Sequence, residues 1–523
     1  MFSTKRLQYV KVKTLIGALL FLSCICFGQN TFNRTYEFGF HTAFVNVWEW
    51  NSNFYTCGLV QDSTGNQFSL NISRFDETGD ELFQKYYYSQ DTTWWTNDDC
   101  NISKDSIFII AVHRYTINQE HTTLIWINSE GDSLMTRSFA SPHFDPDIPD
   151  NNFISVRSID KNEQGDIYVT SQLFQDEATG NDFVIMKLNA QGDSLWSYIV
   201  ADSFGQYCYD IQAVDDGVIV ATNSMTGPGT QKFFKLDSNG NYLSEWDFTC
   251  DETNESSGIP NEFILEEDGI VFATEYSDYP QNWHLPYFIK TDYSGNIMWE
   301  IALDGNHEYQ QWNYHLVKAQ DGGYVGAAWH NQLFPENVEL NGIYNWSAWL
   351  IKISEQGALE WERFYHFIES PFDKHRVADL KATSDGGYIF CGDAIDNDIE
   401  TNGQVIQKGW LVKVDGCGCL VPGCDEDCVV GIEETGVERS RYFRVGPNPA
   451  SQFLNIYLSQ YAIPTAQCLF QLRDMKGKLI KQFEARTFNT TYMLDVEKYE
   501  NGTYILSLEI DGKTMQSEII IKQ

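Results

Sequence analysis

Basic residues and proline are scarce in this chain. Among 523 residues there are 13 prolines and 35 lysines plus arginines, against 73 aspartates plus glutamates. The formal charge of −38 argues against binding of nucleic-acid phosphates, which requires clustered basic side chains. It equally disfavours an anionic membrane surface as a partner. The apolar share of 42% supports a packed core, so the chain is not a disordered acidic tail.

Aromatic residues, by contrast, make up 15% of the chain, and together with the scarcity of proline they favour β structure. The length leaves room for several domains, or for one large repeat fold and a small domain. The charge is also divided unevenly. Residues 1–28 carry four basic residues and no acid, and residues 441–523 carry 10 basic and 8 acidic residues. The middle, residues 29–440, therefore holds a net charge of −44.

Long apolar runs are missing except near the N-terminus. Lys11 and Lys13 precede an unbroken apolar run over residues 15–27, and Gly28 follows it. A helix of this length rises about 20 Å, short of the ~30 Å of a bilayer core. We therefore predict that residues 1–28 are a cleaved signal peptide and that the mature chain begins at Gln29 without a transmembrane segment. A retained anchor or a buried helix is the alternative.

A short pattern recurs through the middle of the chain: an apolar strand ending in Lys, a turn with Gly, then Leu or Met and often Trp. Residues 185–196, 289–299 and 351–361 are clear copies. An Asp, Asn or Ser caps backbone N–H groups, and a Gly three residues later takes the left-handed conformation that closes a hairpin. The repeat-turn glycines, spaced 48 to 62 residues apart, are Gly79, Gly131, Gly192, Gly240, Gly295, Gly357 and Gly418.

A second motif lies upstream in each repeat, as in residues 321–328 and 385–392, where an Asp-Gly turn leads into a buried strand. A further short strand precedes it, so each repeat has four strands. About seven such repeats predict an all-β chain with an approximately seven-bladed β-propeller over residues 29–420, with six or eight blades as alternatives. The last repeat lacks a fourth strand, and we expect residues 31–38 to supply it and close the ring.

The form Asp-x-x-Gly-x-x-x-Trp at Asp292, Gly295 and Trp299 resembles the repeats of quinoprotein-like and delta-60-like propellers. The resemblance covers short motifs only. The Asp box of sialidases spaces its Asp and Gly differently and matches less well. Because Trp196, Trp299 and Trp361 recur at one repeat position, we expect them to pack between blades rather than to bind a ligand.

The composition changes in residues 442–523, where Trp disappears and short alternating strands are separated by Gly turns. This pattern predicts a small immunoglobulin-like β-sandwich. The segment resembles the type A C-terminal sorting domain of the type IX secretion system of Bacteroidota. The resemblance rests on Pro447, Asn448, Pro449, Gly477, Lys478, Gly502, Tyr504 and Lys522. It implies contact with the type IX translocon and sorting machinery, and release of the cargo or its attachment to the outer cell surface. An ordinary accessory domain of this fold is the alternative.

Four cysteines cluster around the linker predicted at residues 421–441: Cys417, Cys419, Cys424 and Cys428. Their spacing suits zinc, but in an exported protein disulfides are the preferred interpretation. Cys57 and Cys391 occupy equivalent strand positions and are expected in the core.

No catalytic residue can be assigned from the sequence. The chain has no His-Glu-x-x-His motif and no Gly-x-Ser-x-Gly motif. The alternating Asp393, Asp396 and Asp398 are a weak calcium candidate, although a solvated acidic loop is favoured because the EF-hand spacing is absent. No other cofactor is expected. Non-repeated tryptophans that are candidates for covering blade edges or stacking on sugars are Trp94, Trp95, Trp283, Trp312, Trp329 and Trp346.

The leading functional hypothesis is a secreted or surface-exposed, non-catalytic propeller that binds an extracellular glycan or protein through variable loops. A secreted, glycosidase-like hydrolase with a carboxylate pair on one propeller face is the alternative. A quinone-cofactor dehydrogenase is a third hypothesis, based on the blade motif alone. A funnel with two carboxylates ~5–10 Å apart and perturbed pKa values would favour the hydrolase.

Overall fold

A computed structural model describes a large part of the chain after residue 28. The described residues are 29–61, 68–88, 92–95, 101–104, 107–116, 119–140, 154–174, 181–200, 206–224, 230–248, 256–257, 262–278, 283–303, 315–332, 345–367, 373–396, 405–421, 424, 443–446, 453–458, 468–474, 478–485, 491–499, 501–510 and 513–522. The chain divides into two compact units, Met1–Gly431 and Ile432–Gln523. Over the described ranges the regular structure is all β, and no helix there is long and apolar enough to span a membrane.

The first unit is built from groups of consecutive antiparallel strands, which we call strand groups. The strands of the first half are β1 (Phe32–Tyr36), β2 (His41–Trp50), β3 (Asn53–Gln61), β4 (Phe68–Phe75), β5 (Glu81–Tyr87), β6 (Thr92–Trp95), β7 (Asn101–Lys104), β8 (Ile107–Thr116), β9 (Gln119–Asn128), β10 (Ser133–Ala140), β11 (Ile154–Lys161), β12 (Ile167–Phe174), β13 (Asn181–Leu188) and β14 (Ser194–Val200). They pair as β2 to β5, as β6 and β7 through β10, and as β11 to β14.

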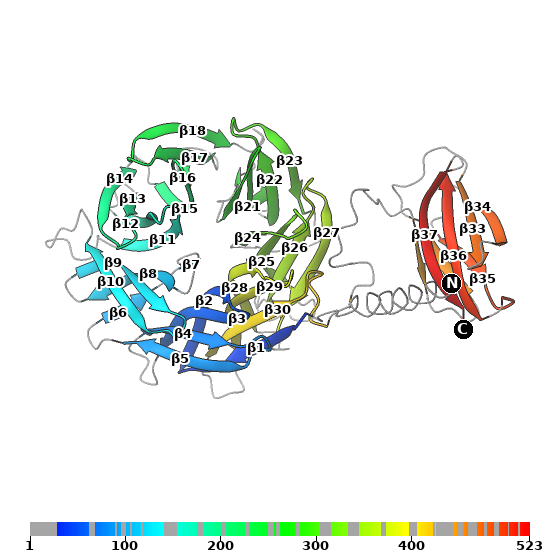
Figure 1. Cartoon of the computed structure of the whole chain (residues 1–523), viewed down its shortest axis with the longest axis horizontal. Coiled ribbons are helices and arrows are strands. Elements are labelled where there is room, and N and C mark those ends of the chain that lie inside the picture. Colours follow the sequence, from blue (N-terminus) through cyan, green and yellow to red (C-terminus); the bar gives the residue numbers. More distant parts are fainter. Residues whose placement is uncertain are drawn as a thin grey trace, which may run out of the picture. The chain divides into compact units, whose positions relative to one another are not determined.

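The second half continues in the same way. Its strands are β15 (Gln206–Val214), β16 (Gly217–Ser224), β17 (Thr230–Asp237), β18 (Tyr242–Phe248), β19 (Ser256–Ser257), β20 (Phe263–Glu266), β21 (Gly269–Asp278), β22 (Trp283–Thr291), β23 (Ile297–Ala302), β24 (His315–Lys318), β25 (Tyr324–Gln332), β26 (Asn345–Ile353), β27 (Leu359–Tyr365), β28 (Lys374–Ala382), β29 (Tyr388–Asp396) and β30 (Ile406–Val414). The groups follow one another around a ring, with β2, β11, β15, β24 and β28 on its inner side and β5, β14, β18, β23 and β27 on its outer side (Figure 1).

The hydrophobic core lies between neighbouring strand groups. One cluster joins Ile109 and Leu124 of β8 and β9 to Val156 and Val169 of β11 and β12, and all four side chains are buried. Each sheet thus buries apolar side chains against its neighbour. This mutual burial explains why a repeat of about 50 residues needs the adjacent repeats to be stable.

Strand β1 completes the last strand group. It pairs antiparallel with β30, from Phe32 opposite Lys413 to Tyr36 opposite Gly409. The Thr31 hydroxyl donates to the Leu420 carbonyl at 2.5 Å. The expected pairing of residues 31–38 with the last group is therefore confirmed over β1. The start of the described chain covers an edge that β30 would otherwise expose.

The repeat turns have the predicted geometry. At one of them, the Asp237 carboxylate accepts the backbone N–H groups of Asn239 and Asn241, each at 2.8 Å, and Gly240 has a φ of +83°. All of the repeat-turn glycines have φ between +71° and +83°. The left-handed backbone explains why glycine recurs at this position.

The recurrent lysine and the upstream Asp-Gly turn contact each other. Lys352 places Nζ 2.8 Å from an Asp321 carboxylate oxygen, and its side chain is only 2% exposed. The equivalent pairs elsewhere are Lys187 with Asp166, Lys235 with Asp216, Lys290 with Asp268 and Lys413 with Asp385. The lysine thus ties the third strand of a group to the turn between its first and second strands.

The recurrent tryptophans contact the next strand group, as predicted. Trp299 of β23 lies over Gly357, where an added Cβ would come within 2.6 Å of the indole ring. Its Nε1–H donates to the Glu355 carbonyl at 3.1 Å. Trp196 covers Gly240 and Trp361 covers Gly418 in the same way. The turn glycine therefore serves two purposes, because it permits the left-handed turn and leaves room for the neighbouring ring.

The second unit has two sheets. Their strands are β31 (Phe443–Gly446), β32 (Phe453–Leu458) and β35 (Thr491–Asp495) in one sheet, and β33 (Cys468–Asp474), β34 (Leu479–Ala485), β36 (Gly502–Ile510) and β37 (Lys513–Lys522) in the other. Leu454 and Leu494 of the first sheet and Phe470 and Leu506 of the second belong to one buried cluster. This unit therefore has its own hydrophobic core.

Candidate functional site

A polar side chain recurs on the inner strands or directly before them, and we call its places the inner polar positions. They are Asn46, Ser158, Asp210, Glu262, His315 and Asp379, all of them less than 9% exposed. Each directly precedes an apolar residue. The strand register shifts just before Asn46, Ser158, Asp210 and Asp379. Such bulges turn a side chain away from its usual face, and here they recur at one place in the repeat.

Several of these side chains accept a backbone hydrogen bond from the next strand group. These bonds run from Ile211 N–H to Ser158 Oγ at 3.3 Å, from Phe263 N–H to Asp210 Oδ2 at 3.2 Å, from Leu316 N–H to Glu262 Oε2 at 2.6 Å, and from Val47 N–H to Asp379 Oδ2 at 2.8 Å. The inner polar positions therefore link neighbouring groups around the ring. Since a buried N–H without a partner is costly, these bonds favour one fixed packing of the groups.

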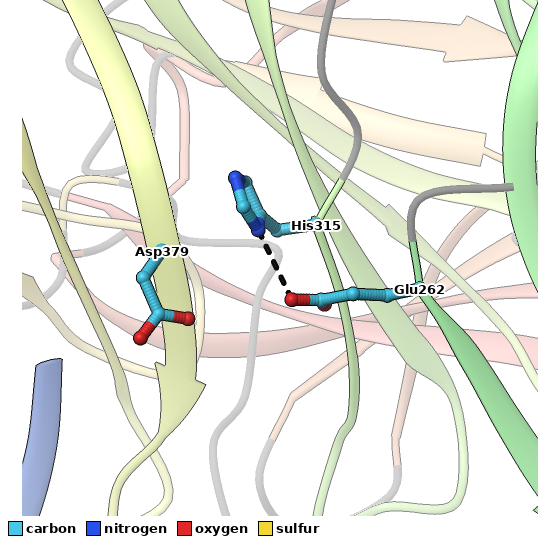
Figure 2. Close-up of side chains that lie close together, drawn as sticks. All are labelled: Glu262, His315 and Asp379. Atoms are coloured by element: carbon cyan, nitrogen blue, oxygen red, sulfur yellow. Dashed lines mark hydrogen bonds and ion pairs between the residues drawn. The ribbon is translucent and has the colours of Figure 1, made fainter. Parts of the chain in front are cut away.

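Three of these positions come together in the Glu–His–Asp cluster, formed by Glu262, His315 and Asp379. Figure 2 shows the three side chains projecting toward one another from different segments. His315 Nδ1 lies 3.1 Å from Glu262 Oε1, and one ligand-type atom from each residue lies within 4.8 Å of the others. The exposed fractions are 6%, 2% and 1%, in chain order. Lys381 adds a cation, with Nζ 2.8 Å from Asp379 Oδ1.

The two carboxyl groups of the cluster have pKa values displaced in opposite directions. Burial alone would raise the pKa of Glu262, but the charges of His315 and Lys381 outweigh burial and hold it below its ordinary value. Burial raises the pKa of Asp379 to about 6, and the Glu262 charge adds to this, against the opposing effect of Lys381. Divergent values of this kind are common at functional sites, although structural ion-pair networks also produce them.

The cluster suits ion binding or ring stabilisation better than glycoside cleavage. A glycosidase pair has to face its substrate, with one carboxyl group on each side of the scissile bond. Glu262 and Asp379 are instead buried, and both accept backbone N–H groups of neighbouring strand groups. One imidazole and two carboxylates are, however, a ligand set found around divalent transition metals.

The calcium candidate does not fit the structure at Asp393. Both of its carboxylate oxygens are engaged by Arg376, whose Nη2 lies 2.8 Å from Oδ2 and whose Nε lies 3.0 Å from Oδ1. The guanidinium neutralises the carboxylate that calcium would require. Asp396 ends β29, and Asp398 lies outside the described residues.

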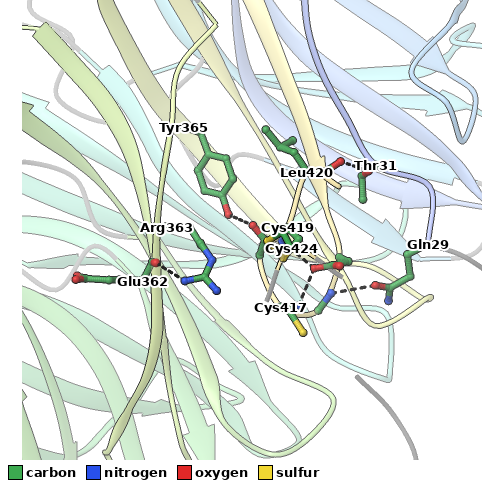
Figure 3. The surroundings of a disulfide bond; sticks show 12 residues. Gln29, Thr31, Glu362, Arg363, Tyr365, Cys417, Cys419, Leu420 and Cys424 are labelled. Carbon is green, nitrogen blue, oxygen red and sulfur yellow. Dashed lines mark hydrogen bonds between the residues drawn. A yellow bond between two sulfur atoms is a disulfide. The ribbon is translucent and has the colours of Figure 1, made fainter. Parts of the chain in front are cut away.

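The cysteines near the end of the ring are engaged in disulfides. Cys419 is bonded to Cys424, and Cys417 is disulfide-bonded too. The Tyr365 hydroxyl donates to the Gly418 carbonyl at 2.6 Å beside this disulfide (Figure 3). Cys428 lies outside the described residues. A cysteine in a disulfide has no thiolate to offer, so these residues do not act as zinc ligands. Cys57 and Cys391 are buried in the core, as expected.

Part of the predicted sorting motif falls in described strands. Gly502 begins β36 and pairs with Lys522 of β37, and Tyr504 is buried in the core of the second unit. Lys478 precedes β34. Pro447, Asn448, Pro449 and Gly477 lie outside the described residues.

Two of the non-repeated tryptophans form an aromatic pair. The rings of Trp329 and Trp346 are stacked, with centroids 5.4 Å apart, and Lys374 Nζ lies 4.5 Å from the Trp346 centroid. Trp329 Nε1–H also donates to the Val377 carbonyl at 2.8 Å. Both indole rings are therefore engaged in contacts within the first unit. Trp94, Trp95 and Trp283 lie in β6 and β22, and Trp312 lies outside the described residues.

His375, beside this pair, is expected to make stability depend on pH. Its Nε2 accepts the Phe367 N–H at 3.0 Å and its Nδ1 contacts the Trp346 carbonyl at 3.0 Å, so the ring is bound in its neutral form. Burial lowers its pKa to about 4. The unfolded chain, with a histidine pKa of about 6.5, takes up a proton first, so stability falls between about pH 6.5 and pH 4, by up to about 3 kcal/mol.

The measurement is urea unfolding at pH 7 and pH 4 for the wild type and His375→Gln. Every titratable group except His375 is present in both proteins, so its contribution cancels in the comparison. The free energy of unfolding lost between pH 7 and pH 4 should therefore be smaller in the variant by about 2–3 kcal/mol. Equal losses in the two proteins would refute this role for His375.

Comparisons with known proteins identify the C-terminal segment. No curated protein matches the chain. Solved structures resemble it at low identity. A europium-containing methanol dehydrogenase is 10% identical, with a TM-score of 0.36. The match covers 71% of this chain and 81% of the dehydrogenase chain. The Pseudomonas brassicacearum lignostilbene dioxygenase is 10% identical with a TM-score of 0.38, covering 74% and 89%. An α-L-arabinofuranosidase from Fusarium graminearum is 10% identical with a TM-score of 0.38, covering 73% and 98%.

These likenesses are too distant to carry an argument about activity. The family comparison is specific: residues 444–522 match the model described as a secretion system C-terminal sorting domain. This match supports the predicted type IX sorting domain. The chain thus carries a secretion system sorting domain at residues 444–522, which indicates export to the cell surface or the extracellular space.

Proposed function

We propose that this protein is an exported, non-catalytic scaffold that binds a glycan or another protein outside the cell. The observation that carries the proposal is that the carboxylates at the inner polar positions are occupied by hydrogen bonds within the ring. Asp210, Glu262 and Asp379 are buried and accept backbone N–H groups of adjacent strand groups. They serve the ring itself, so ligand contact falls to the loops and exposed side chains around it.

In this proposal the ring has seven blades, closed by β1. The strand pairing supports the count, because successive groups lead from β2 to β30 and β1 supplies the outermost strand of the last group. Residues 1–28 are removed as a signal peptide, residues 29–420 form the propeller, and residues 421–441 form a disulfide-containing linker. Residues 442–523 form an immunoglobulin-like sorting domain, recognised by type IX machinery in a member of the Bacteroidota.

Binding would use the rigidity of the ring. The tryptophan–glycine contacts and the lysine–aspartate pairs fix each group against its neighbours or within itself. A fixed framework holds the connecting loops in place, so little ordering entropy is lost when a ligand binds. The acidic middle segment, at −44, favours neutral or cationic partners over polyanions.

The test applies the mature chain, from Gln29, to a glycan array and to a panel of glycosidase substrates. We expect selective binding to a small set of ligands and no release of product. Turnover that a single substitution, Glu262→Gln or Asp379→Asn, abolishes would refute the proposal.

That outcome would support the alternative, a secreted hydrolase. One observation favours it: Glu262 and Asp379 lie in one cluster and have pKa values displaced in opposite directions. An acid and a base are arranged in this way in many hydrolases. Their burial is the argument against it.

A further inference from the structure

We propose that Glu262, His315 and Asp379 form a binding site for one divalent transition-metal cation, with Zn²⁺ as the preferred ion. The site lies on the inner side of the ring, where three successive strand groups meet. Each ligand comes from a different group, so a bound cation would join three groups through one centre.

The geometry supports this assignment. One ligand atom from each of the three side chains lies within 4.8 Å of the others. Ligands of Zn²⁺ lie about 2.0–2.2 Å from the metal, so small rotations of the carboxylates would bring all three to bonding distance. His315 Nδ1 and Glu262 Oε1, at 3.1 Å, are already as close as two ligands of one tetrahedral ion. Backbone hydrogen bonds also hold the two carboxylates in place. Leu316 N–H donates to Glu262 and Val47 N–H donates to Asp379.

The chemistry of the ligands selects the class of cation. Imidazole nitrogen suits zinc and other transition metals, whereas calcium and magnesium prefer oxygen ligands throughout. Two carboxylates and one neutral imidazole carry a charge of −2, which a divalent cation neutralises. A buried site favours such neutrality, because an uncompensated charge is costly away from water.

The cluster also goes beyond what the ring requires at this place. At Asp210, the equivalent position, Oδ1 accepts the Ser158 hydroxyl at 2.9 Å and Oδ2 accepts the Phe263 N–H. A hydroxyl and one carboxylate are therefore sufficient to link two groups. Glu262 and Asp379 perform the same linking, yet together with His315 they place an imidazole and two carboxylates within 4.8 Å of one another.

Lys381 provides the counter-charge when no cation is bound. Its Nζ lies 2.8 Å from Asp379 Oδ1, and its side chain is 32% exposed. The long, partly exposed side chain can swing toward solvent when a divalent cation takes its place. Binding of the cation thus exchanges one contact of Asp379 for another and leaves the backbone hydrogen bonds of the ring in place.

The test is calorimetric titration of the metal-stripped mature chain with Zn²⁺, in 0.15 M salt with excess Ca²⁺ to occupy the acidic surface. We expect one equivalent of Zn²⁺ to bind and to raise the melting temperature. Loss of an outer-shell partner typically weakens metal binding by about 10–100-fold, so Glu262→Gln and His315→Gln should weaken it at least as much. The matched control is Ser158→Ala, which changes an equivalent position two strand groups away from Glu262 and should leave Zn²⁺ binding unchanged.

X-ray absorption at the zinc edge of the wild-type complex keeps the test independent of how well the variants fold. It should show one imidazole and oxygen ligands. No saturable binding, equal affinity in the three variants and the wild type, or a spectrum without imidazole would each overturn the assignment.

Discussion

A chain that ends at Gly431 is expected to stay inside the cell envelope, whereas the full chain reaches the cell surface or the medium. The sorting domain at residues 444–522 belongs to a compact unit of its own, Ile432–Gln523, with a separate hydrophobic core. Its removal should therefore abolish export while the first unit still folds. The measurement is cell fractionation with immunoblotting in a host that has a type IX secretion system, together with the sensitivity of intact cells to added protease.

Two controls accompany this truncation. Circular dichroism of the purified truncated protein should show that the first unit keeps its β structure and its cooperative melting. A fusion of residues 432–523 to an unrelated periplasmic protein should be exported. Equal export of the full and truncated chains would contradict the assigned role of the sorting domain.

Gly357→Ala is expected to be the most damaging of the single methyl additions considered for the ring. Gly357 has a φ of +82°, and an added Cβ would lie 2.6 Å from the Trp299 ring. The left-handed backbone costs a side chain about 1–2 kcal/mol, and overpacking a fixed neighbour costs about 1–3 kcal/mol. We therefore expect a loss of about 3–4 kcal/mol in the free energy of unfolding, measured by urea denaturation.

Gly322→Ala separates the two effects. Gly322 has a φ of +90°, but its nearest neighbour to an added Cβ is a Glu355 carboxylate oxygen at 3.6 Å. This variant should carry only the backbone cost, about 1–2 kcal/mol. If both variants lost the same stability, the contact between Trp299 and Gly357 would contribute nothing, and the proposed locking of neighbouring strand groups would be wrong.

Much of the local structure of the ring could be predicted from the sequence because it depends on residue identity. A left-handed turn requires glycine, so the turn glycines repeat visibly, and all have positive φ. The pairing of the two strands beside each such turn was predictable too, and β22 pairs with β23 and β26 with β27. Residues 31–38 resemble the outer strand around residues 361–367, and the last repeat lacked a fourth strand, so the pairing of β1 with β30 could be expected.

The Glu–His–Asp cluster could not be predicted in the same way. The inner polar positions share polarity and place but not identity, being Ser158, Asp210, Glu262 and His315 in successive groups. They recur 52, 52 and 53 residues apart, and this regularity was the available signal. It was weak because β20 and β24 have only four residues each. His315 lies in no known metal motif of the sequence, because its partners in the cluster come from other strand groups.

The structure explains part of the acidic charge of the chain. Several acidic side chains of the ring have defined roles, as caps of turns, partners of buried lysines or links between strand groups. Such roles account for particular carboxylates such as Asp237, Asp321 and Glu262. The exposed acidic groups without such a role set the long-range electrostatic field around the protein. This field influences which partners approach it.

Single-injection calorimetry of the mature chain with a ligand selected on the glycan array tests the central claim most directly. A binding scaffold gives a heat pulse that returns to baseline and saturates at a fixed stoichiometry. We expect this result, reproduced by the same protein sample after the ligand is dialysed away. A sustained heat signal that lasts until the ligand is consumed, and that disappears in Asp379→Asn, would show turnover and contradict the account.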